Sequence, residues 1–278
     1  MDVGIGLPST IRGATREQLL EWARRAEARG FSSLGTIDRI VYGNYEPLVA
    51  LAAAGAVTER IKLLTSVLLA PTRRSGALLA KQAASVAALA GSGRMVLGVA
   101  VGGREDDFTA VDADFHARGR DFDAMLAEFE QTWNGDAIGP AGRPTLIIGG
   151  SVPAAFERTA RYAEGWIMGG GTPDMLREGA EKTRAAWKAA GREGEPRIMA
   201  LSYYALGDGA KDAARAYLGD YYGFLGDYVD AIVGSAATDA DTVRAYVQGF
   251  TDAGCDELVF FPSDPDPGQV DLLADAIS

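Results

Sequence analysis

The sequence predicts an α/β protein with the fold of a (β/α)8 TIM barrel, in which eight parallel strands alternate with helices. Short apolar runs are each followed by a break and then by an amphipathic stretch of roughly ten to seventeen residues. Eight such alternations fit into the 278 residues, and a barrel of this kind typically needs about 250 residues. A doubly wound open sheet stays the alternative, because a count of strands does not show closure.

The first half of the chain supplies four strand–helix units. The expected strands are Val3–Pro8, Phe31–Ile37, Ile61–Ala70 and Arg94–Val101. Thr15-Arg-Glu-Gln18 has the sequence of a capping box and opens a helix that ends at Gly30. The next helices are Pro47–Glu59, Leu78–Leu89 and Gly119–Trp133. Ile61–Ala70 lacks polar alternation, as expected of a strand buried on both faces.

The second half repeats the pattern. Its strands are Thr145–Gly149, Gly165–Met168, Ile198–Leu206 and Glu257–Phe261. Its helices are Pro153–Ala163, Met175–Ala190, much of 210–253, and Gln269–Ile277. Pro and Gly fall between these segments and do not gather into a linker, so we expect residues 1–278 to form one domain.

Composition excludes several classes of partner. A net charge of −11 and a pI near 4.7 argue against nucleic acid and anionic membranes. A single cysteine, Cys255, allows no intrachain disulfide, and no targeting or membrane segment stands out, so we expect a cytoplasmic protein. Residues 1–200 hold 24 basic and 24 acidic residues, whereas residues 201–278 hold 3 and 14, so the whole excess lies in the last 78 residues.

Metal ligation and nucleophilic catalysis find little support. The chain has one histidine, His116, and no ligand spacing typical of zinc, so no metal is expected. His116 lies in a charged segment without a G-x-S-x-G turn and is expected at the surface. Four nearby acids are expected in a solvated loop rather than at a metal: Asp106, Asp107, Asp112 and Asp114.

Glycine-rich turns end three neighbouring strands of the predicted barrel. They are Gly98–Gly103, Gly149–Ser151 and Gly169–Thr172. In a barrel all three lie at the carboxyl-end mouth, where active sites form. Glycine lets backbone N–H groups approach a ligand, and Gly150-Ser151 before the Pro153 helix has the form of a phosphate site. Ordinary turns into helices are the alternative reading.

Arginines follow each of the first four strands. They are Arg12, Arg39, Arg73, Arg74 and Arg104. On one rim they would form a cationic arc able to receive an anionic group. Separate, solvated surface arginines are the alternative.

Several segments resemble a known family over nearly the whole chain. They are Gly30–Arg39, Thr65–Gly103, Phe115–Trp133, Leu146–Ser151, Arg161–Ile167 and Asp252–Pro262. Together they resemble the luciferase-like flavin oxidoreductases, also called bacterial luciferase-like monooxygenases, of which one branch uses the deazaflavin coenzyme F420. Residues 207–236 match least.

The resemblance implies a barrel with F420 or FMN at its carboxyl-end mouth. The family's non-prolyl cis peptide at the end of the third strand corresponds to Ser66–Val67. The implied cofactor-binding residues are Asp38, Thr65, Ser66, Val67, Ala100, Val101, Gly149, Gly150, Ser151 and Gly170.

Two positions depart from the family pattern. Many members have a histidine where this chain has Arg39, and one branch has a glutamate where this chain has Gly103. A proton relay built on those two groups is therefore not carried over. Candidate catalytic residues in its place are Arg39, Tyr42, Glu105 and Tyr203.

The function implied is that of a flavin- or deazaflavin-dependent oxidoreductase. It would transfer hydride to or from a small organic substrate, or act as a monooxygenase with reduced flavin. The short chain, the TSVLLAPTRR segment (Thr65–Arg74) and the arginine arc favour F420 over FMN. Family members are commonly dimers, so a homodimer is expected.

Two other functions stay open. A barrel that binds cofactor with little or no catalytic activity would explain the missing histidine and glutamate. An unrelated barrel enzyme, such as an aldolase, would need a lysine at a strand end, but Lys62 lies at a strand start. Because Asp264 and Asp266 follow the last strand in the acidic part of the chain, we expect a neutral or cationic substrate rather than a sugar phosphate.

Overall fold

The computed structural model describes residues 1–136 and 142–278. In these residues the strands form one parallel sheet in the order β3-β2-β1-β9-β8-β7-β6-β5-β4, and β3 also pairs with β5, which closes the sheet into a barrel. The strands are β1 (Asp2–Gly6), β2 (Ser33–Thr36), β3 (Lys62–Thr65), β4 (Leu68–Leu69), β5 (Met95–Ala100), β6 (Thr145–Gly149), β7 (Gly165–Met168), β8 (Arg197–Tyr204) and β9 (Glu257–Pro262). The predicted barrel is confirmed, and the open sheet is wrong.

The third barrel strand is interrupted. The segment Ile61–Ala70, expected as one strand, divides into β3 and β4, and the peptide bond between Ser66 and Val67 is cis. Both parts pair with β5, with Leu63 opposite Met95 and Leu69 opposite Ala100. The cis bond lies where the family resemblance implies it.

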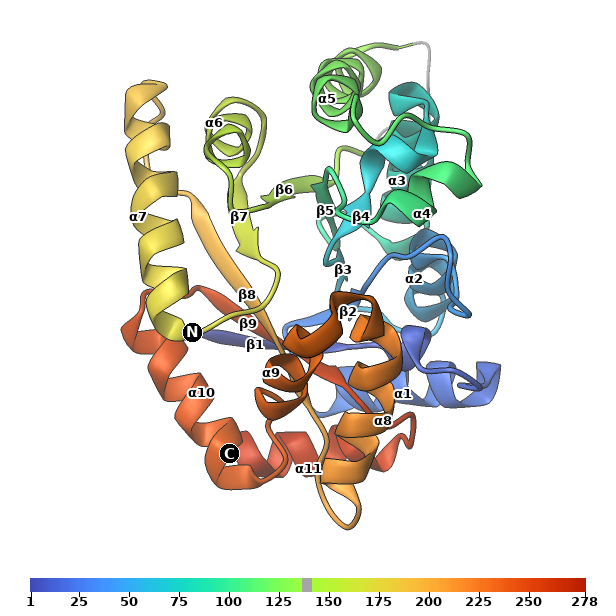
Figure 1. Cartoon of the computed structure of the whole chain (residues 1–278). Helices are drawn as coiled ribbons and strands as arrows, with labels where there is room; N and C mark the ends of the chain where they lie inside the picture. The colour runs from blue at the N-terminus through green and yellow to red at the C-terminus, as the bar shows by residue number, and fades with distance from the viewer. Residues whose placement is uncertain (137–141) are drawn as a thin grey trace.

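Helices surround the ring of strands on its outside (Figure 1). They are α1 (Arg16–Ala28), α2 (Pro47–Gly55), α3 (Gly76–Ala90), α5 (Arg118–Asn134), α6 (Pro153–Tyr162), α7 (Pro173–Ala189), α10 (Ala240–Asp252) and α11 (Gly268–Ile277). Side-chain caps define several starts: Thr15 and Gln18 form the predicted capping box, and Thr172 caps α7. None of the described helices has both the length and the apolar character needed to cross a membrane.

Two apolar layers hold the barrel. Residues such as Ile5, Leu63 and Leu97 point outward and pack under the helices, whereas Leu64, Ile147 and Val259 fill the interior. Because each strand is buried on both faces, its sequence is an almost unbroken apolar run. Short 3-10 helices, η1 (Pro8–Thr10) and η2 (Ala70–Arg73), follow β1 and β4. The sequence did not predict α4 (Glu105–Ala110), which follows β5.

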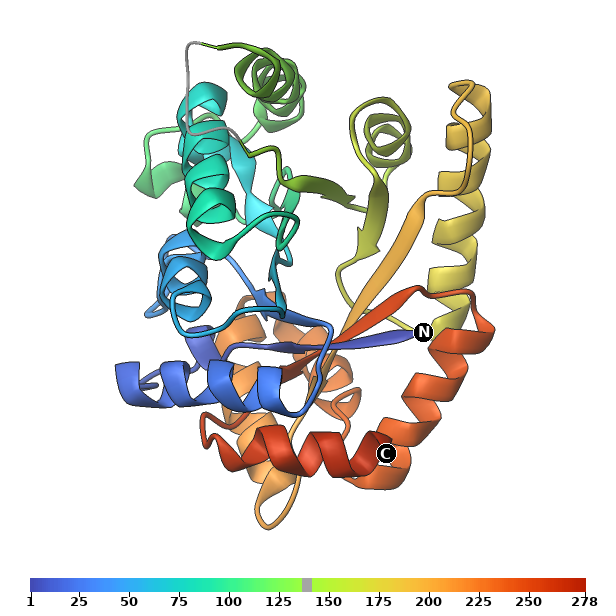
Figure 2. The ribbon, with the colours of Figure 1, turned by 180° about the vertical axis from the view of Figure 1, so that it is seen from behind.

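An excursion after β8 covers part of the mouth. It comprises α8 (Ala210–Tyr222), η3 (Gly223–Tyr228) and α9 (Val229–Gly234). Its ends meet, because the backbone N–H of Ala237 donates to the carbonyl of Tyr203 at 2.9 Å. α8 and α9 lie in front of the strands in Figure 1 and behind them in Figure 2, so they occupy one end of the barrel. Tyr217 and Leu218 of α8 pack into the interior cluster.

Candidate active site

Half of the barrel mouth is open. Along the carboxyl ends of the strands from β5 to β7, Gly103, Gly150, Ser151 and Gly169 are exposed. A Cβ atom placed on Gly103, Gly169 or Gly170 would meet no atom within 4 Å. Backbone groups on this side are therefore accessible to a ligand, as the glycine-rich turns predict.

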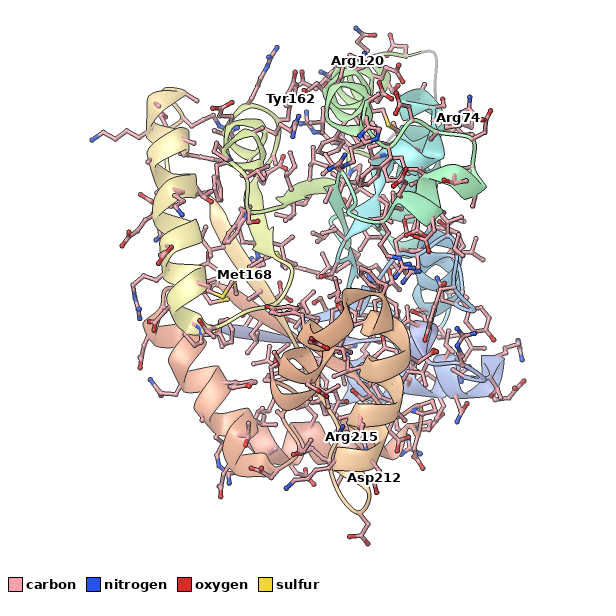
Figure 3. All side chains as sticks on the ribbon, viewed as in Figure 1. Arg74, Arg120, Tyr162, Met168, Asp212 and Arg215 are labelled. Atoms are coloured by element: carbon pink, nitrogen blue, oxygen red, sulfur yellow. The ribbon has the colours of Figure 1, made fainter. Side chains whose placement is uncertain are left out.

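A pocket of about 370 Å³ lies behind the ends of β6 and β7. Its apolar lining comes from Phe156, Trp166, Met168 and Met175, and its polar lining includes Ser151, Glu178 and Lys182. The indole N–H of Trp166 donates to the carbonyl of Gly150 at 2.7 Å and so holds the turn after β6. Met168 lies near the beginning of α7 (Figure 3). A cation and backbone N–H groups above an apolar floor suit an anionic group on an organic molecule.

Ser66 carries an unsatisfied hydroxyl at the end of the third barrel strand. The residue is 3% exposed, and within residues 1–136 and 142–278 its hydroxyl oxygen has no hydrogen-bond partner. The hydroxyl of neighbouring Thr65 is used internally, because it donates to the carbonyl of Gly98 at 2.7 Å. A buried hydroxyl without a partner is costly, so Ser66 is a group that a bound molecule could satisfy.

Asp38 is buried after the end of β2 and accepts three hydrogen bonds from two donors. Its carboxylate accepts hydrogen bonds from the Arg73 guanidinium at 2.9 and 3.0 Å and from the backbone N–H of Leu69 at 2.9 Å. Burial raises the pKa of Asp38, while the charge of Arg73 opposes that rise. Asp38 thus joins the end of β2 to β4, directly beyond the cis peptide.

Arg39 and Asp107 form a second buried pair. The Arg39 Nε atom donates to an Asp107 carboxylate oxygen at 3.1 Å, and the backbone N–H groups of Ile40 and Val41 donate to the other oxygen at 2.9 and 2.7 Å. Asp107 is fully buried in α4. The prediction of a solvated acidic loop is therefore wrong for Asp107, because the charge of Arg39 and two N–H groups replace its hydration.

The predicted cationic arc is neutralised. Besides Arg39 and Arg73, the Arg12 Nε atom lies 2.7 Å from an Asp220 oxygen, and the Arg74 Nη1 atom lies 3.4 Å from Asp112. Arg104 pairs with Asp106, and this contact lowers the pKa of the Asp106 carboxyl. Because every arginine of the arc has an acidic partner, the arc presents no unpaired positive charge to a ligand.

The acidic excess of residues 201–278 is divided between the mouth and the outside of the barrel. Asp220 lies at the mouth, where it pairs with Arg12, and Asp264 and Asp266 follow the carboxyl end of β9. Asp271 and Asp275 pair with Arg25 and Arg29 of α1, on the outside of the barrel. Asp212 lies at the outer end of α8 (Figure 3).

Aromatic rings cover the other half of the mouth. Tyr42 after β2 and Tyr203 at the end of β8 meet rings of the excursion, and Phe261 of β9 packs against Tyr203. The excursion contributes Tyr217, Tyr221, Tyr222 and Phe224. We call these seven residues the aromatic cover. Partly buried Val67, at the cis bond, packs against the same interior cluster. The aromatic cover therefore borders the open half of the mouth.

Hydroxyl groups link the aromatic cover to the barrel. The hydroxyls of Thr10 and Tyr217 lie 2.6 Å apart, as do those of Tyr203 and Tyr222. The Tyr42 hydroxyl donates to a carboxylate oxygen of Asp220, and this oxygen also accepts a hydrogen bond from the Arg12 Nε atom. Burial raises the pKa of Tyr42 to about 12, and Asp220 adds to this rise. These phenols therefore stay protonated at neutral pH.

The structure places the predicted site residues at one end of the barrel but in different surroundings. Val67, Val101, Gly150, Ser151 and Gly170 are at least partly accessible, whereas these predicted residues are buried: Asp38, Thr65, Ser66, Ala100 and Gly149. Tyr42 and Tyr203 both belong to the aromatic cover, and Arg39 donates a hydrogen bond to Asp107. Glu105 begins α4 with an exposed side chain, and His116 is exposed as expected.

Sequence reasoning missed four residues that shape the mouth: Asp107, Lys182, Asp220 and Tyr222. The tyrosines in DYYGFLGDY (220–228) are a signal that could have drawn attention to the excursion. Lys182 carries no such signal, because it lies on an amphipathic helix among other charged residues.

Comparison with known proteins supports the resemblance. A family model described as luciferase-like monooxygenase matches residues 1–253. An uncharacterised protein of Mycobacterium tuberculosis, Rv0940c, is 32% identical over 218 residues, which cover 65% of this chain and 75% of the relative.

Solved structures with similar folds cover the whole chain. The monooxygenase RslO1 from Streptomyces bottropensis has a TM-score of 0.82 at 20% identity, covering 100% of this chain and 98% of that one. An F420-dependent secondary alcohol dehydrogenase, in complex with an F420–acetone adduct, has a TM-score of 0.84 at 19% identity and covers 100% of both chains. At these identities the likeness shows the fold alone.

Proposed function

This chain belongs to the luciferase-like monooxygenase family, and from that membership we propose that it is a flavin- or deazaflavin-dependent oxidoreductase. It would transfer hydride to or from a small organic substrate. The observation that carries the proposal is the unsatisfied Ser66 hydroxyl beside an open, glycine-lined mouth. A buried donor and accessible backbone groups fit the polar edge of a flat ring system.

The residues of the open half would hold the cofactor. Ser66 and Val67 would back its ring, with Val101 beside it. The backbone of Gly149, Gly150 and Gly170, with Ser151, would bind its phosphate. Lys182, whose ammonium group lies 3.7 Å from Glu178, would contact the anionic group at the pocket of about 370 Å³. When bound, the cofactor supplies the redox chemistry, and the protein supplies orientation and exclusion of water.

Buried acid–base pairs would keep this end of the barrel rigid. The two donors to Asp38 would fix the loop beyond the cis peptide, and the Arg39–Asp107 pair would fix the loop after β2 against α4. Arg39, which donates to Asp107 and to the carbonyl of Val41 at 2.9 Å, would act by positioning this loop. Tyr42 and Tyr203 are the candidates that carry a phenolic proton, which Tyr42 donates to Asp220 and Tyr203 shares with Tyr222.

The choice between F420 and FMN depends on where the protein can bind their anionic groups. The similar fold of an F420-dependent secondary alcohol dehydrogenase favours F420. FMN is favoured by the pairing of every arginine of the arc, because a long anionic tail would then lack a free cation on that rim. We propose F420 as the first candidate and FMN as the second.

Two alternatives remain. The first is oxygen activation on reduced flavin, a monooxygenase reaction like that named for RslO1. The second, which the missing histidine and glutamate favour, is a barrel that binds the cofactor without turnover. Both need the same cofactor site, so cofactor binding is tested first and turnover second.

Titration of the purified protein with oxidised F420 and with FMN tests the proposal. Quenching of cofactor fluorescence with saturation at one site per chain is expected for one of them. Binding should then support turnover of alcohols, ketones or enones. Binding without turnover of that panel, with or without oxygen, would favour the silent barrel. Failure to bind either cofactor would refute the proposal.

A further inference from the structure

The hydroxyl pair of Tyr203 and Tyr222 contains one unused hydrogen. The two oxygens lie 2.6 Å apart, so one hydroxyl donates and the other accepts. Two hydroxyls carry two hydrogens, and a single hydrogen bond between them uses one. The second hydrogen is therefore free to donate to another acceptor.

Burial determines which hydroxyl keeps the free hydrogen. Tyr203 is 5% exposed and, in the described part of the chain, its hydroxyl has no recorded partner besides Tyr222. If Tyr222 donated, the hydrogen of Tyr203 would be left in the apolar interior, which is costly. Tyr203 therefore donates, and the partly exposed Tyr222 keeps a free O–H. Burial also raises the pKa of both phenols, so neither is lost as a donor at neutral pH.

The surroundings of Tyr222 are aromatic. Its ring centroid lies 4.9 Å from that of Tyr221 and 6.4 Å from that of Phe224, which is 49% exposed. A molecule that accepts a hydrogen bond from Tyr222 would lie beside the exposed ring of Phe224.

Charge limits what can bind there. Arginines already stack on the rings: Arg12 lies 4.4 Å from the Tyr42 centroid, and Arg104 lies 3.9 Å from that of Phe224. Because these guanidinium groups already lie over the two rings, the rings offer little attraction to a further cation. An anion gains little, because Asp220 and Asp106 already neutralise the two arginines.

We propose that the free hydroxyl of Tyr222 binds an oxygen atom of an uncharged, flat aromatic substrate that lies beside the exposed ring of Phe224. This substrate class rests on the proposed oxidoreductase function and makes it more specific. It also narrows the expectation of a neutral or cationic substrate to a neutral one. Tyr222 acts as a recognition group for a carbonyl or hydroxyl oxygen, and Tyr203 orients it.

Three probes that share a naphthalene ring test the proposal. 2-Acetylnaphthalene carries a neutral acceptor oxygen, 2-ethylnaphthalene has a similar shape without it, and 2-naphthoate is an anion. Their dissociation constants are measured calorimetrically at neutral pH, with and without cofactor. We expect the ketone to bind about five- to tenfold more tightly than the hydrocarbon, the range of one hydrogen bond, and more tightly than the anion.

Variants assign the effect to one hydroxyl. Tyr222→Phe keeps the ring and should remove the preference for the ketone over the hydrocarbon, while Tyr203→Phe should reduce it. Tyr162→Phe is the control, because Tyr162 lies on α6, away from the cover (Figure 3). Unchanged thermal unfolding of each variant shows that the fold is intact.

The outcomes separate this proposal from the proposed function. A ketone preference that persists in Tyr222→Phe, or tighter binding of 2-naphthoate than of the ketone, overturns the substrate class. Tyr222→Phe should leave cofactor fluorescence quenching unchanged. A wild-type protein that binds neither cofactor refutes the oxidoreductase function, while the ketone preference, measured without cofactor, still decides the role of Tyr222.

Discussion

Arg39 and Asp107 form a buried ion pair between the loop after β2 and α4 at the barrel mouth, with the Arg39 Nε atom 3.1 Å from an Asp107 carboxylate oxygen. Asp107 is fully buried, and the Arg39 side chain is 5% exposed. Arg39 stands where many members of the family have a histidine. The pairing explains how a permanently charged group is accommodated at that position, since Asp107 neutralises it and the carbonyl of Val41 accepts a hydrogen bond from its Nη2 atom.

Breaking this pair should destabilise the protein. Asp107→Ala leaves the Arg39 charge and the N–H groups of Ile40 and Val41 buried without an acceptor, and we expect the free energy of unfolding to fall by about 3–5 kcal/mol. Urea unfolding measures this change. The control is Asp112→Ala, since Asp112 is exposed and pairs with an exposed Arg74. Its loss should cost no more than about 1 kcal/mol. Equal effects would contradict the buried role of Asp107.

Gly98 should tolerate no side chain. A Cβ atom there would lie 2.0 Å from the carbonyl oxygen of Thr65, which is backbone and cannot move aside cheaply. We expect Gly98→Ala to lower the free energy of unfolding by at least about 1–3 kcal/mol. The matched control is Gly103→Ala, where the new Cβ meets no atom within 4 Å. Chemical denaturation compares the two, and a stable Gly98→Ala protein would show that β3 and β5 are less closely packed.

Lys182 should contribute to cofactor affinity. Its ammonium group lies on the lining of the pocket behind β6 and β7 and is only 3.7 Å from Glu178, in an exposed pair that contributes little to stability. We expect Lys182→Ala to weaken binding of F420 or FMN about tenfold, as for the loss of one charged hydrogen bond. Fluorescence titration gives the dissociation constant. Lys188→Ala, exposed on the same helix, should bind as the wild type does.

Alkaline pH should loosen the aromatic cover. The pKa of Tyr42 is raised to about 12 by burial and by Asp220, whereas an unfolded tyrosine titrates near about 10. Below the lower value both states are protonated and stability is complete. Between the two values only the unfolded chain releases its proton, so stability falls as pH rises.

Urea unfolding across this pH range tests the effect of Tyr42. The free energy of unfolding should decline less steeply in Tyr42→Phe than in the wild type. Near-ultraviolet absorbance of tyrosinate should also show one late-titrating group fewer in the variant. Identical slopes would indicate that Tyr42 is as accessible to solvent in the folded protein as in the unfolded chain.

Local sequence was enough to predict most elements of the barrel. Strands buried on both faces need unbroken apolar runs, and helices that cover them need one apolar face, so both patterns can be read without knowing the contacts. The capping box at Thr15 and Gln18 was predicted for the same reason, because its hydrogen bonds span three residues. Ser66–Val67 was located by family resemblance rather than by local pattern.

The sequence alone therefore determined the barrel, its strand ends and the side of the barrel on which a site forms. The tertiary structure alone decided the net charge and the accessibility of the side chains at those strand ends. Whether Arg39 is a free cation depends on Asp107, 68 residues away, and whether Arg12 is free depends on Asp220, 208 residues away. The Tyr203–Tyr222 pair depends on how α8 folds back over β8. Charge and burial at a site come from residues that meet only when the chain closes, and one-dimensional patterns do not record which of them meet.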